Sequence, residues 1–176
     1  VGTPVLIGVG WNTYPTLSFA DINNDGRTDV LGRDAAGDIW VIPGQGGTGT
    51  NMLGSRYYIG GGWYSDYWTN AYTADLNNDG HTDMIGRNRN GDLYLYPGTG
   101  RTGTETVGTP VLIGVGWNTY PTLSFADINN DGLVDLIGRD AGGALWAYPH
   151  TGGSGTQTLG SRVLLGQGWS GLDIIR

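Results

Sequence analysis

The chain has 176 residues and contains neither cysteine nor lysine. Without cysteine it forms no disulfide, so its stability must come from side-chain packing or from bound metal. No apolar run approaches 18 residues, which excludes a membrane-spanning helix, and no stretch shows the spacing of an amphipathic helix. The nine basic residues are arginines scattered along the chain, so the basic face that nucleic-acid binding requires is not expected.

Residues that carry nucleophilic or acid–base catalysis are also scarce. His81 lies inside a repeated acidic motif and His150 at a turn, and no Gly-x-Ser-x-Gly elbow is present. Glycoside hydrolysis needs two cooperating carboxylates, one of them with a raised pKa, and no such pair stands out. The sequence therefore predicts a protein that is not an enzyme. The acids outside the repeated motif are Asp34, Asp38, Asp66, Asp92, Glu105, Asp140 and Asp173.

Glycine and aromatic residues are abundant. The chain has 34 glycines, 7 tryptophans and 10 tyrosines, and the glycines follow no collagen period. This composition is typical of many short strands joined by tight turns. We therefore expect an all-β fold.

A nine-residue acidic motif occurs three times, at residues 21–29, 75–83 and 127–135. Oxygen-bearing side chains stand at its positions 1, 3, 5 and 9, and a glycine at position 6 permits the chain to reverse. Position 7 varies, as expected if only its backbone carbonyl is a ligand. Calcium prefers six to eight oxygen ligands, so we expect one Ca²⁺ in each motif, about three per chain. The predicted ligands are Asp21, Asn23, Asp25, Arg27 and Asp29; Asp75, Asn77, Asp79, His81 and Asp83; and Asp127, Asn129, Asp131, Leu133 and Asp135.

Two other interpretations of the motif are weaker. A hairpin turn explains the Asn-Asp-Gly sequence but not the flanking aspartates. An EF-hand ends with a glutamate at position 12, where all three motifs have glycine, and its flanks are helical rather than short apolar runs. We therefore expect each loop to join two strands, with Asp29, Asp83 and Asp135 replacing the glutamate.

The net charge of −7 is explained by these motifs, which hold nine of the sixteen acidic residues. Three calcium ions would contribute +6 and leave about −1, so the acidity describes metal sites more than a partner. Calcium modules of millimolar affinity function where the ion is abundant, outside the cell. The sequence thus favours a secreted protein.

Internal repetition defines the architecture. Residues 1–26 are identical to residues 107–132, and the acidic motifs begin at 21, 75 and 127. Spacings of 54 and 52 residues are close to the length of a four-stranded propeller blade. We predict a single repeat array over 1–176, a β-propeller of four-stranded blades with about three blades per chain. The expected units are approximately 11–62, 63–116 and 117–169, with a surplus outer-strand segment at 1–10.

The predicted outer strand lies in a seven-residue phrase that ends in Gly-Trp. This phrase occurs four times in three units, at residues 5–11, 57–63, 111–117 and 163–169, so one copy exceeds the blade count. Known propellers generally close with four or more blades, and three blades would leave two apolar flanks open. We therefore expect the chain either to associate with copies of itself or to form part of a longer array. Homo-oligomerisation into a dimer of six blades is the simplest closure, with the surplus strand crossing to lock the ring.

The phrase Phe-Ala-Asp-x-Asn-Asn-Asp-Gly-x-x-Asp, followed by Gly-Arg-Asp or Gly-Arg-Asn and by a Pro-Gly-Thr-Gly loop, resembles FG-GAP and VCBS repeats. The resemblance covers nearly the whole chain. It implies an integrin-like propeller with one calcium per blade and an adhesion or binding role, as in secreted bacterial proteins. The Ile-Gly-Gly-Gly-Trp corner separately resembles a phrase of tachylectin-type propeller lectins.

A Gly-Trp dipeptide recurs at Trp11, Trp63, Trp117 and Trp169, and we call each of these positions a Gly-Trp corner. The corners suggest a glycan site. Sugar rings stack on exposed aromatic rings while amides, hydroxyls and guanidinium groups bind the sugar oxygens. The alternative is that these tryptophans pack between blades, and we expect Trp40 and Trp146 to lie in the core. Two functions remain open: a multivalent carbohydrate-binding, lectin-like or adhesion module, and a structural or engineered symmetric scaffold with no ligand other than calcium. The candidate ligand-binding residues are Trp11, Asn12, Tyr14, Arg33, Trp63, Arg87, Trp117, Asn118, Tyr120, Arg139 and Trp169.

Overall fold

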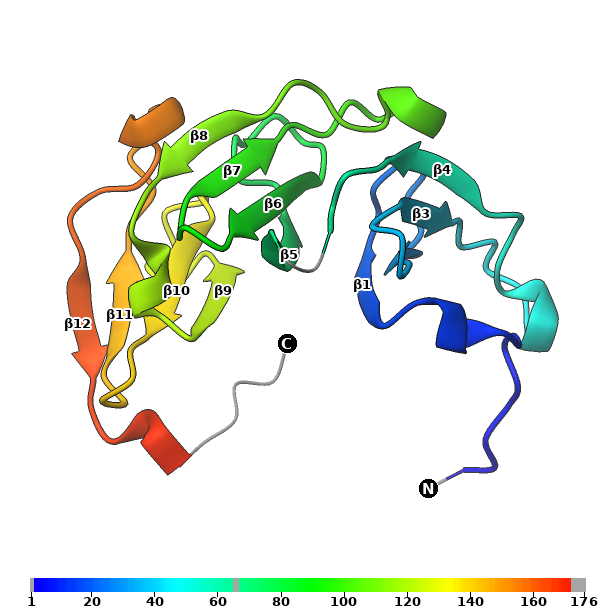
Figure 1. The fold of residues 1–176 in the computed structure, drawn as a ribbon, viewed down its shortest axis with the longest axis horizontal. Coiled ribbons are helices and arrows are strands. Elements are labelled where there is room, and N and C mark those ends of the chain that lie inside the picture. The colour runs from blue at the N-terminus through cyan, green and yellow to red at the C-terminus, as the bar shows by residue number, and fades with distance from the viewer. Residues whose placement is uncertain (1, 65–66, 172–176) are drawn as a thin grey trace.

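The computed structural model describes residues 2–64 and 67–171. These residues form three antiparallel sheets of four strands each, and consecutive strands are neighbours in every sheet. Figure 1 shows the sheets following one another around a common centre, with the second between the first and the third. This is the arrangement of propeller blades, so the predicted all-β fold with three four-stranded blades is confirmed.

The strands are short and regularly placed. Blade 1 consists of β1 (Thr16–Ala20), β2 (Asp29–Arg33), β3 (Ile39–Ile42) and β4 (Tyr57–Gly60). Blade 2 consists of β5 (Trp68–Ala74), β6 (Asp83–Asn88), β7 (Leu93–Tyr96) and β8 (Val111–Gly114), and blade 3 of β9 (Thr122–Ala126), β10 (Asp135–Arg139), β11 (Leu145–Tyr148) and β12 (Val163–Gly166).

Short 3-10 helices lie between some of the strands, before the first strand and after the last. They are η1 (Trp11–Thr13), η2 (Gly49–Asn51), η3 (Gly103–Glu105), η4 (Trp117–Thr119), η5 (Gly155–Gln157) and η6 (Trp169–Gly171). None of the helices among the described residues is long and apolar enough to cross a membrane.

The second and third strands of each blade are joined by a tight turn that an Asx side chain stabilises. In blade 1, Asp34 accepts hydrogen bonds from the amides of Ala36 and Asp38 at 2.9 and 3.0 Å. Gly37 takes a φ of 79°, a left-handed conformation that glycine adopts without steric cost. Asn88 and Asp140 make the equivalent bonds in the other blades, which explains why Asn and Asp interchange at this position.

The hydrophobic core lies mainly between blades. One cluster joins Leu31 and Val41 of blade 1 to Met84 of blade 2. Another joins residues of blade 2, among them Ile85, to residues of blade 3, among them Leu123. Each blade therefore buries its apolar face against its neighbour, and the end blades lack one neighbour each.

Position 12 of each acidic motif is glycine because an aromatic ring lies against it. A Cβ atom at Gly32 would lie 2.7 Å from a ring carbon of Tyr14, and one at Gly138 would lie 2.8 Å from the ring of Tyr120. In blade 2 the rings of Trp63 and Trp68 cover the corresponding glycine. This packing leaves no room for the glutamate that would complete an EF-hand.

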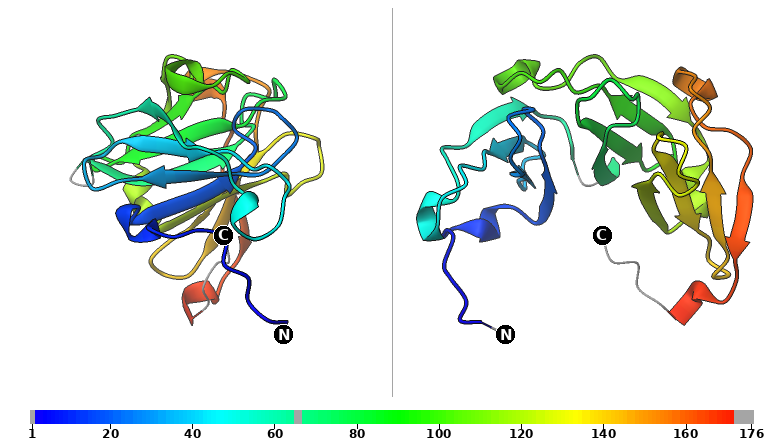
Figure 2. Two further views of the ribbon diagram at one scale, coloured as in Figure 1. Left: turned by 90° about the vertical axis from the view of Figure 1, so that its right-hand side faces the viewer. Right: turned by 180° about the vertical axis from the view of Figure 1, so that it is seen from behind.

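Residues 2–10 form no strand among the described residues, although they contain the fourth copy of the outer-strand phrase. The side chains of Val5, Leu6, Ile7 and Val9 are exposed. Figure 1 and the rear view in Figure 2 show this segment on the side where blades 1 and 3 lie apart.

Candidate calcium loops and blade junctions

Each acidic motif forms the loop between the first two strands of its blade. Residues 21–29 connect β1 to β2, residues 75–83 connect β5 to β6, and residues 127–135 connect β9 to β10. The flanking strands pair as antiparallel hairpins, with Ala20 opposite Asp29 in blade 1. The loop thus joins strands, as the apolar flanks predicted.

Backbone amides hold the oxygen-bearing side chains at the first positions of the loop. Asp21 accepts hydrogen bonds from the amides of Asp25 and Gly26 at 3.0 and 2.8 Å. The side-chain oxygen of Asn23 also accepts from the Asp25 amide, at 3.0 Å. Because Gly26 has a φ of 83°, the chain turns tightly around these oxygens. The same bonds recur in the other two loops with lengths of 2.8 to 3.1 Å.

The aspartate at position 9 is fully buried in all three loops. The two oxygens of Asp29 accept hydrogen bonds from the amides of Gly44, at 2.9 Å, and Ile22, at 3.3 Å. Burial raises the pKa of Asp29 and of Asp83. The amides of Gly44 and Ile22 only partly oppose this rise at Asp29, and those of Gly98, Leu76 and Asn77 do the same at Asp83. A buried carboxylate is costly unless a positive charge or further donors compensate it.

No basic side chain of the described ranges forms an ion pair with these carboxylates. Across the described ranges, the one ion pair joins Arg101 to Glu105 on the surface, at 3.3 Å. Within the same ranges, no three His, Cys, Asp or Glu side chains gather closely enough to hold a metal ion. Two of the five predicted ligands in each loop are not His, Cys, Asp or Glu side chains, because position 3 supplies a side-chain amide oxygen and position 7 a backbone carbonyl. The donors are all oxygens, which fits calcium, and a bound ion would draw the carboxylates together.

The Gly-Trp corners connect neighbouring blades. The amides of Trp63, Trp117 and Trp169 donate to the carbonyls of Gly37, Gly91 and Gly143, each at 2.9 Å. These glycines belong to the turn between the second and third strands of the preceding blade. Each corner is therefore fixed on the blade before it.

The four corner tryptophans differ in exposure. Trp63 and Trp117 are buried and belong to the two core clusters, whereas Trp11 is half-buried and Trp169 is 39% exposed. The buried pair matches the packing alternative, since neither ring presents a face on which a sugar could stack. Of these four, Trp11 and Trp169 alone retain an accessible ring in the single chain, and both lie where a neighbouring blade is missing.

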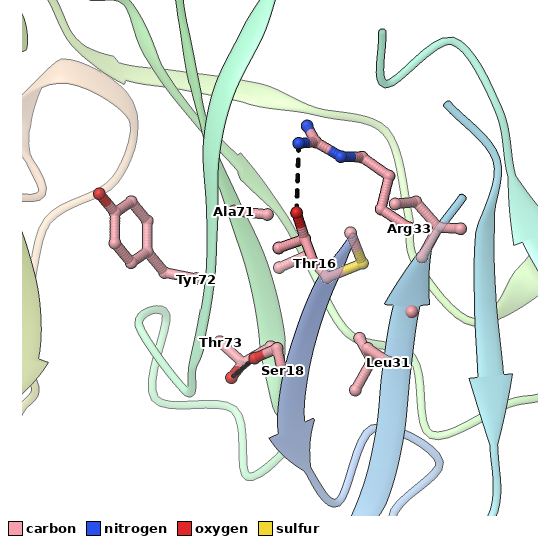
Figure 3. Close-up of a pocket in the computed structure, with 10 residues that line it drawn as sticks. Thr16, Ser18, Leu31, Arg33, Ala71, Tyr72 and Thr73 are labelled. Carbon is pink, nitrogen blue, oxygen red and sulfur yellow. Dashed lines mark hydrogen bonds between the residues drawn. The ribbon is translucent and has the colours of Figure 1, made fainter. Parts of the chain in front are cut away.

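The candidate arginines also lie at the junctions. Arg87 is buried and donates to the carbonyls of Trp117 and Tyr120 at 3.0 and 2.5 Å. Arg33 donates to the carbonyls of Trp63, at 3.4 Å, and Trp68, at 3.0 Å. It also donates to the hydroxyl of Thr16 at 3.4 Å (Figure 3). Arg139 donates in the same way to the carbonyl of Trp169. These guanidinium groups bind corner carbonyls, a role that the sequence pattern does not predict.

The remaining candidates are divided between the core and the surface. Tyr120 is buried, and its hydroxyl lies 2.7 Å from that of Tyr148. Tyr14 is half-buried, while Asn12 and Asn118 are exposed. The side-chain amide of Asn118 donates to the carbonyl of Arg89 at 2.8 Å.

Blades 1 and 3 each contain a cluster between their third and fourth strands that the sequence pattern did not predict. Trp40 is half-buried rather than part of the core; its indole NH donates to Asp34 at 2.9 Å, and Arg56 stacks over its ring at 4.3 Å. Trp146 has the same arrangement with Asp140 and Arg162. The sequence contains a signal for this cluster. Units 1 and 3 combine the tryptophan with an arginine directly before the fourth strand, whereas unit 2 has a tyrosine and a proline at these two positions.

The first strands of the three blades, β1, β5 and β9, line a cavity of about 540 Å³. Its polar lining includes Ser18, Asn70, Thr73 and Ser124, and Phe19 adds an exposed ring. A smaller recess lies between β1 and β5, where the hydroxyls of Ser18 and Thr73 are 3.3 Å apart (Figure 3). The hydroxyls and amides are hydrogen-bonding groups, but no buried acid–base pair lines either cavity.

Comparison with solved structures identifies a lectin from Agrocybe aegerita, described as recognising non-reducing terminal N-acetylglucosamine. The two folds are similar with a TM-score of 0.59 at 20% sequence identity. The similarity covers 88% of this chain and 39% of that chain, so this chain spans less than half of the lectin's length. At this identity the likeness establishes the propeller fold alone. No curated protein matches the chain.

The family comparison agrees with the loop geometry. The FG-GAP-like repeat matches residues 21–86 and again residues 75–138. The matches begin at Asp21 and Asp75, the first residues of two acidic motifs, and together span about two thirds of the chain. The chain therefore belongs to the family of FG-GAP-like repeat proteins.

Proposed function

We propose that this protein is a non-catalytic, calcium-binding propeller that functions outside the cell as a lectin-like module. Calcium binding is supported by the buried carboxylates of Asp29, Asp83 and Asp135, which form no ion pair with any described residue. Each lies in a loop that also presents two further carboxylates. Calcium modules of this kind suit a compartment where the ion is plentiful.

Five residues per loop would hold the ion, and in blade 1 these are Asp21, Asn23, Asp25, Asp29 and the carbonyl of Arg27. Bound calcium would supply the positive charge that compensates the three carboxylates. Isothermal titration of chelator-treated protein should give three sites per chain. A chain that binds no calcium would remove this part of the proposal.

Glycan binding is supported by the fold and by accessible groups at the corners. The lectin from Agrocybe aegerita shares the propeller fold and recognises terminal N-acetylglucosamine. Here Trp169 retains an accessible ring, and Asn12 and Asn118 lie exposed beside the corners. A shallow site of this kind reaches about millimolar affinity, near −4 kcal/mol, and repetition raises avidity.

A glycan array tests this part of the proposal. Calcium-loaded protein should bind glycans whose non-reducing end is N-acetylglucosamine or a related sugar. Absence of binding to every glycan, with calcium bound and the fold intact, would favour the second candidate, a scaffold without a ligand other than calcium. That candidate is supported by Trp63, Trp117 and Arg87, which are committed to blade junctions.

The proposal of a non-catalytic protein is supported by the acids outside the loops. Desolvation would raise the pKa of Asp34, but hydrogen bonds from Asp38, the Trp40 indole and Ala36 lower it below its usual value. The indole of Trp146 likewise lowers the pKa of Asp140. A general acid for glycoside hydrolysis needs the opposite shift.

Self-association completes the proposed function. Apolar side chains such as Phe19 on blade 1 and Leu165 on blade 3 are exposed where neighbouring blades are missing. Two copies would supply six blades, within the range of four to eight that is typical of closed propellers. Light scattering at micromolar concentration should give twice 18.6 kDa.

A further inference from the structure

The identical segments 1–26 and 107–132 lie in different surroundings and so reveal what a preceding blade covers. Leu17 is 40% exposed, whereas its counterpart Leu123, which packs against blade 2, is fully buried. Ile7 is 41% exposed and its counterpart Ile113 only 2%. Since the sequences are the same, the difference comes from the neighbour alone. We call the uncovered surface of blade 1, with Leu17 and Phe19, the leading face.

The opposite comparison defines a second open surface on blade 3. Ile128 is 47% exposed, whereas its counterpart Ile22, covered by blade 2, is 1% exposed. Leu165 of β12 is also exposed, although the matching outer-strand residues Ile59 and Ile113 are buried. We call this surface, with Ile128 and Leu165, the trailing face. A trailing face covers a leading face at both existing junctions of the chain.

The outer strand of one blade rests on the 3-10 turn of the next. Between blades 2 and 3, a Cβ atom at Gly155 would lie 3.9 Å from a methyl of Val111 and 3.8 Å from the carbonyl oxygen of Leu112. At Gly49 of blade 1 the same two distances, 3.9 and 3.8 Å, lead to Val5 and to the carbonyl of Leu6. The leading face therefore holds residues 5–8 in the place of an outer strand whose blade is missing.

We propose that two copies close head to tail and that each junction is a composite. At this junction, β12 of one copy lies on η2 of the other copy, in the place that residues 5–8 of that other copy occupy in the single chain. The Gly-Trp corner next to β12 is then the Trp11 corner of the other copy. The inference deepens the self-association in the proposed function and rests on it. Residues 2–9 and the corner at Trp169 then have no place at the junction and move away from it.

The contacts of β12 explain why it stays in its own blade. Arg162, directly before it, stacks over Trp146 at 4.1 Å and donates to the hydroxyl of Tyr120 at 2.9 Å. The strand also pairs with β11. Residues 5–8 have Pro4 in place of this arginine and pair with no strand of the described chain. Displacing residues 5–8 from η2 therefore loses few contacts. If these residues instead took the place of β12 in blade 3, the Arg162 guanidinium would be lost from the ring of Trp146.

The Trp11 corner stays because its own blade fixes it. The Tyr14 amide donates to the carbonyl of Trp11 at 3.0 Å, and the Tyr14 ring lies over Gly32. At a closed junction, Trp11 would need the carbonyl of Gly143, which now accepts from Trp169. Trp169 is the more exposed of the two corners, so it is the one that gives way.

Disulfide trapping in the full chain tests this arrangement without background, because the chain has no cysteine. The test variant carries Val163→Cys and Gly49→Cys, which the composite junction brings together from different copies. The control variant, Val111→Cys with Gly155→Cys, samples the same contact within one chain. Gly49 and Gly155 share a φ of 59°, so both variants carry the same backbone strain.

Mild oxidation should convert the test variant into a covalent dimer and the control into an internally linked chain. The competing strand exchange would instead trap Val5→Cys with Ala147→Cys, because Ala147 is opposite Val163 in the sheet. A covalent dimer from that pair, with none from the test pair, would overturn the composite junction while leaving closure intact. Wild-type protein that remains at 18.6 kDa would overturn closure itself and would leave calcium and glycan binding to be judged separately.

Discussion

The guanidinium of Arg87 donates to the carbonyl oxygen of Trp117, 3.0 Å away, and so connects the second strand of one blade to the corner of the next. Replacing Arg87 by alanine should lower the free energy of unfolding by about 3 kcal/mol, because buried carbonyls lose their charged donor. Chemical denaturation measures the loss. Arg101→Ala is the control: it removes an exposed ion pair and should cost less than about 1 kcal/mol. Equal effects of the two variants would contradict the connecting role of Arg87.

Calcium should stabilise the folded chain. Each occupied site contributes about 2.7 kcal/mol when free calcium is a hundredfold above its Kd, provided that the unfolded chain does not bind it. Melting curves with calcium and with chelator measure the effect, and identical midpoints would refute calcium binding.

A substitution in one loop should remove only the calcium ion of that loop. Replacing Asp25 by alanine should reduce the stoichiometry from three to two, since it removes a ligand from one loop only. The exposed Asn24 to Ser change, at a position that is not a predicted ligand, is a control for disturbance of the turn. A variant at Asp25 that still binds three ions would show that this residue is not a ligand.

The two kinds of corner tryptophan should respond differently to truncation. Trp117→Ala removes a buried ring from the core between blades 2 and 3, and should cost about 3–5 kcal/mol. Trp169→Ala removes a ring that is already 39% exposed and should cost much less. Denaturation of both variants measures the difference. Loss of glycan binding with Trp117→Ala in a chain of unchanged stability would contradict the packing role of Trp117.

Acid should weaken the outer-strand cluster of blade 3. The hydrogen bond from Trp146 lowers the pKa of Asp140 in the folded chain. A carboxyl whose folded pKa is depressed contributes stability above its unfolded pKa, and this contribution disappears as pH falls through the folded value. In chelator, the loss of stability below about pH 4 should therefore be smaller in Asp140→Asn than in wild type. Asn88 shows that asparagine fits this turn, and identical acid profiles would contradict the prediction.

The sequence predicted the blades well because their signals are local. The strand–loop–strand character of the acidic motif followed from short apolar flanks, and the repeat period gave the number of blades. The roles of Arg33 and Arg87 could not be read in this way, since their acceptors are backbone carbonyls 30 or more residues away in the chain. Exposure of the corner tryptophans was equally inaccessible. Trp11 and Trp117 have identical neighbours in sequence and differ only in whether another blade covers them.

The location of the core between blades also governs how the chain opens. All six residues of β6 are buried, and blade 2 alone has neighbours on both sides. A single blade has little apolar surface to bury by itself, so losing one blade exposes the face of the next. In a chain that has not associated with a second copy, opening should therefore proceed inward from blades 1 and 3, and the amides of β6 should exchange with solvent more slowly than those of β2 or β10.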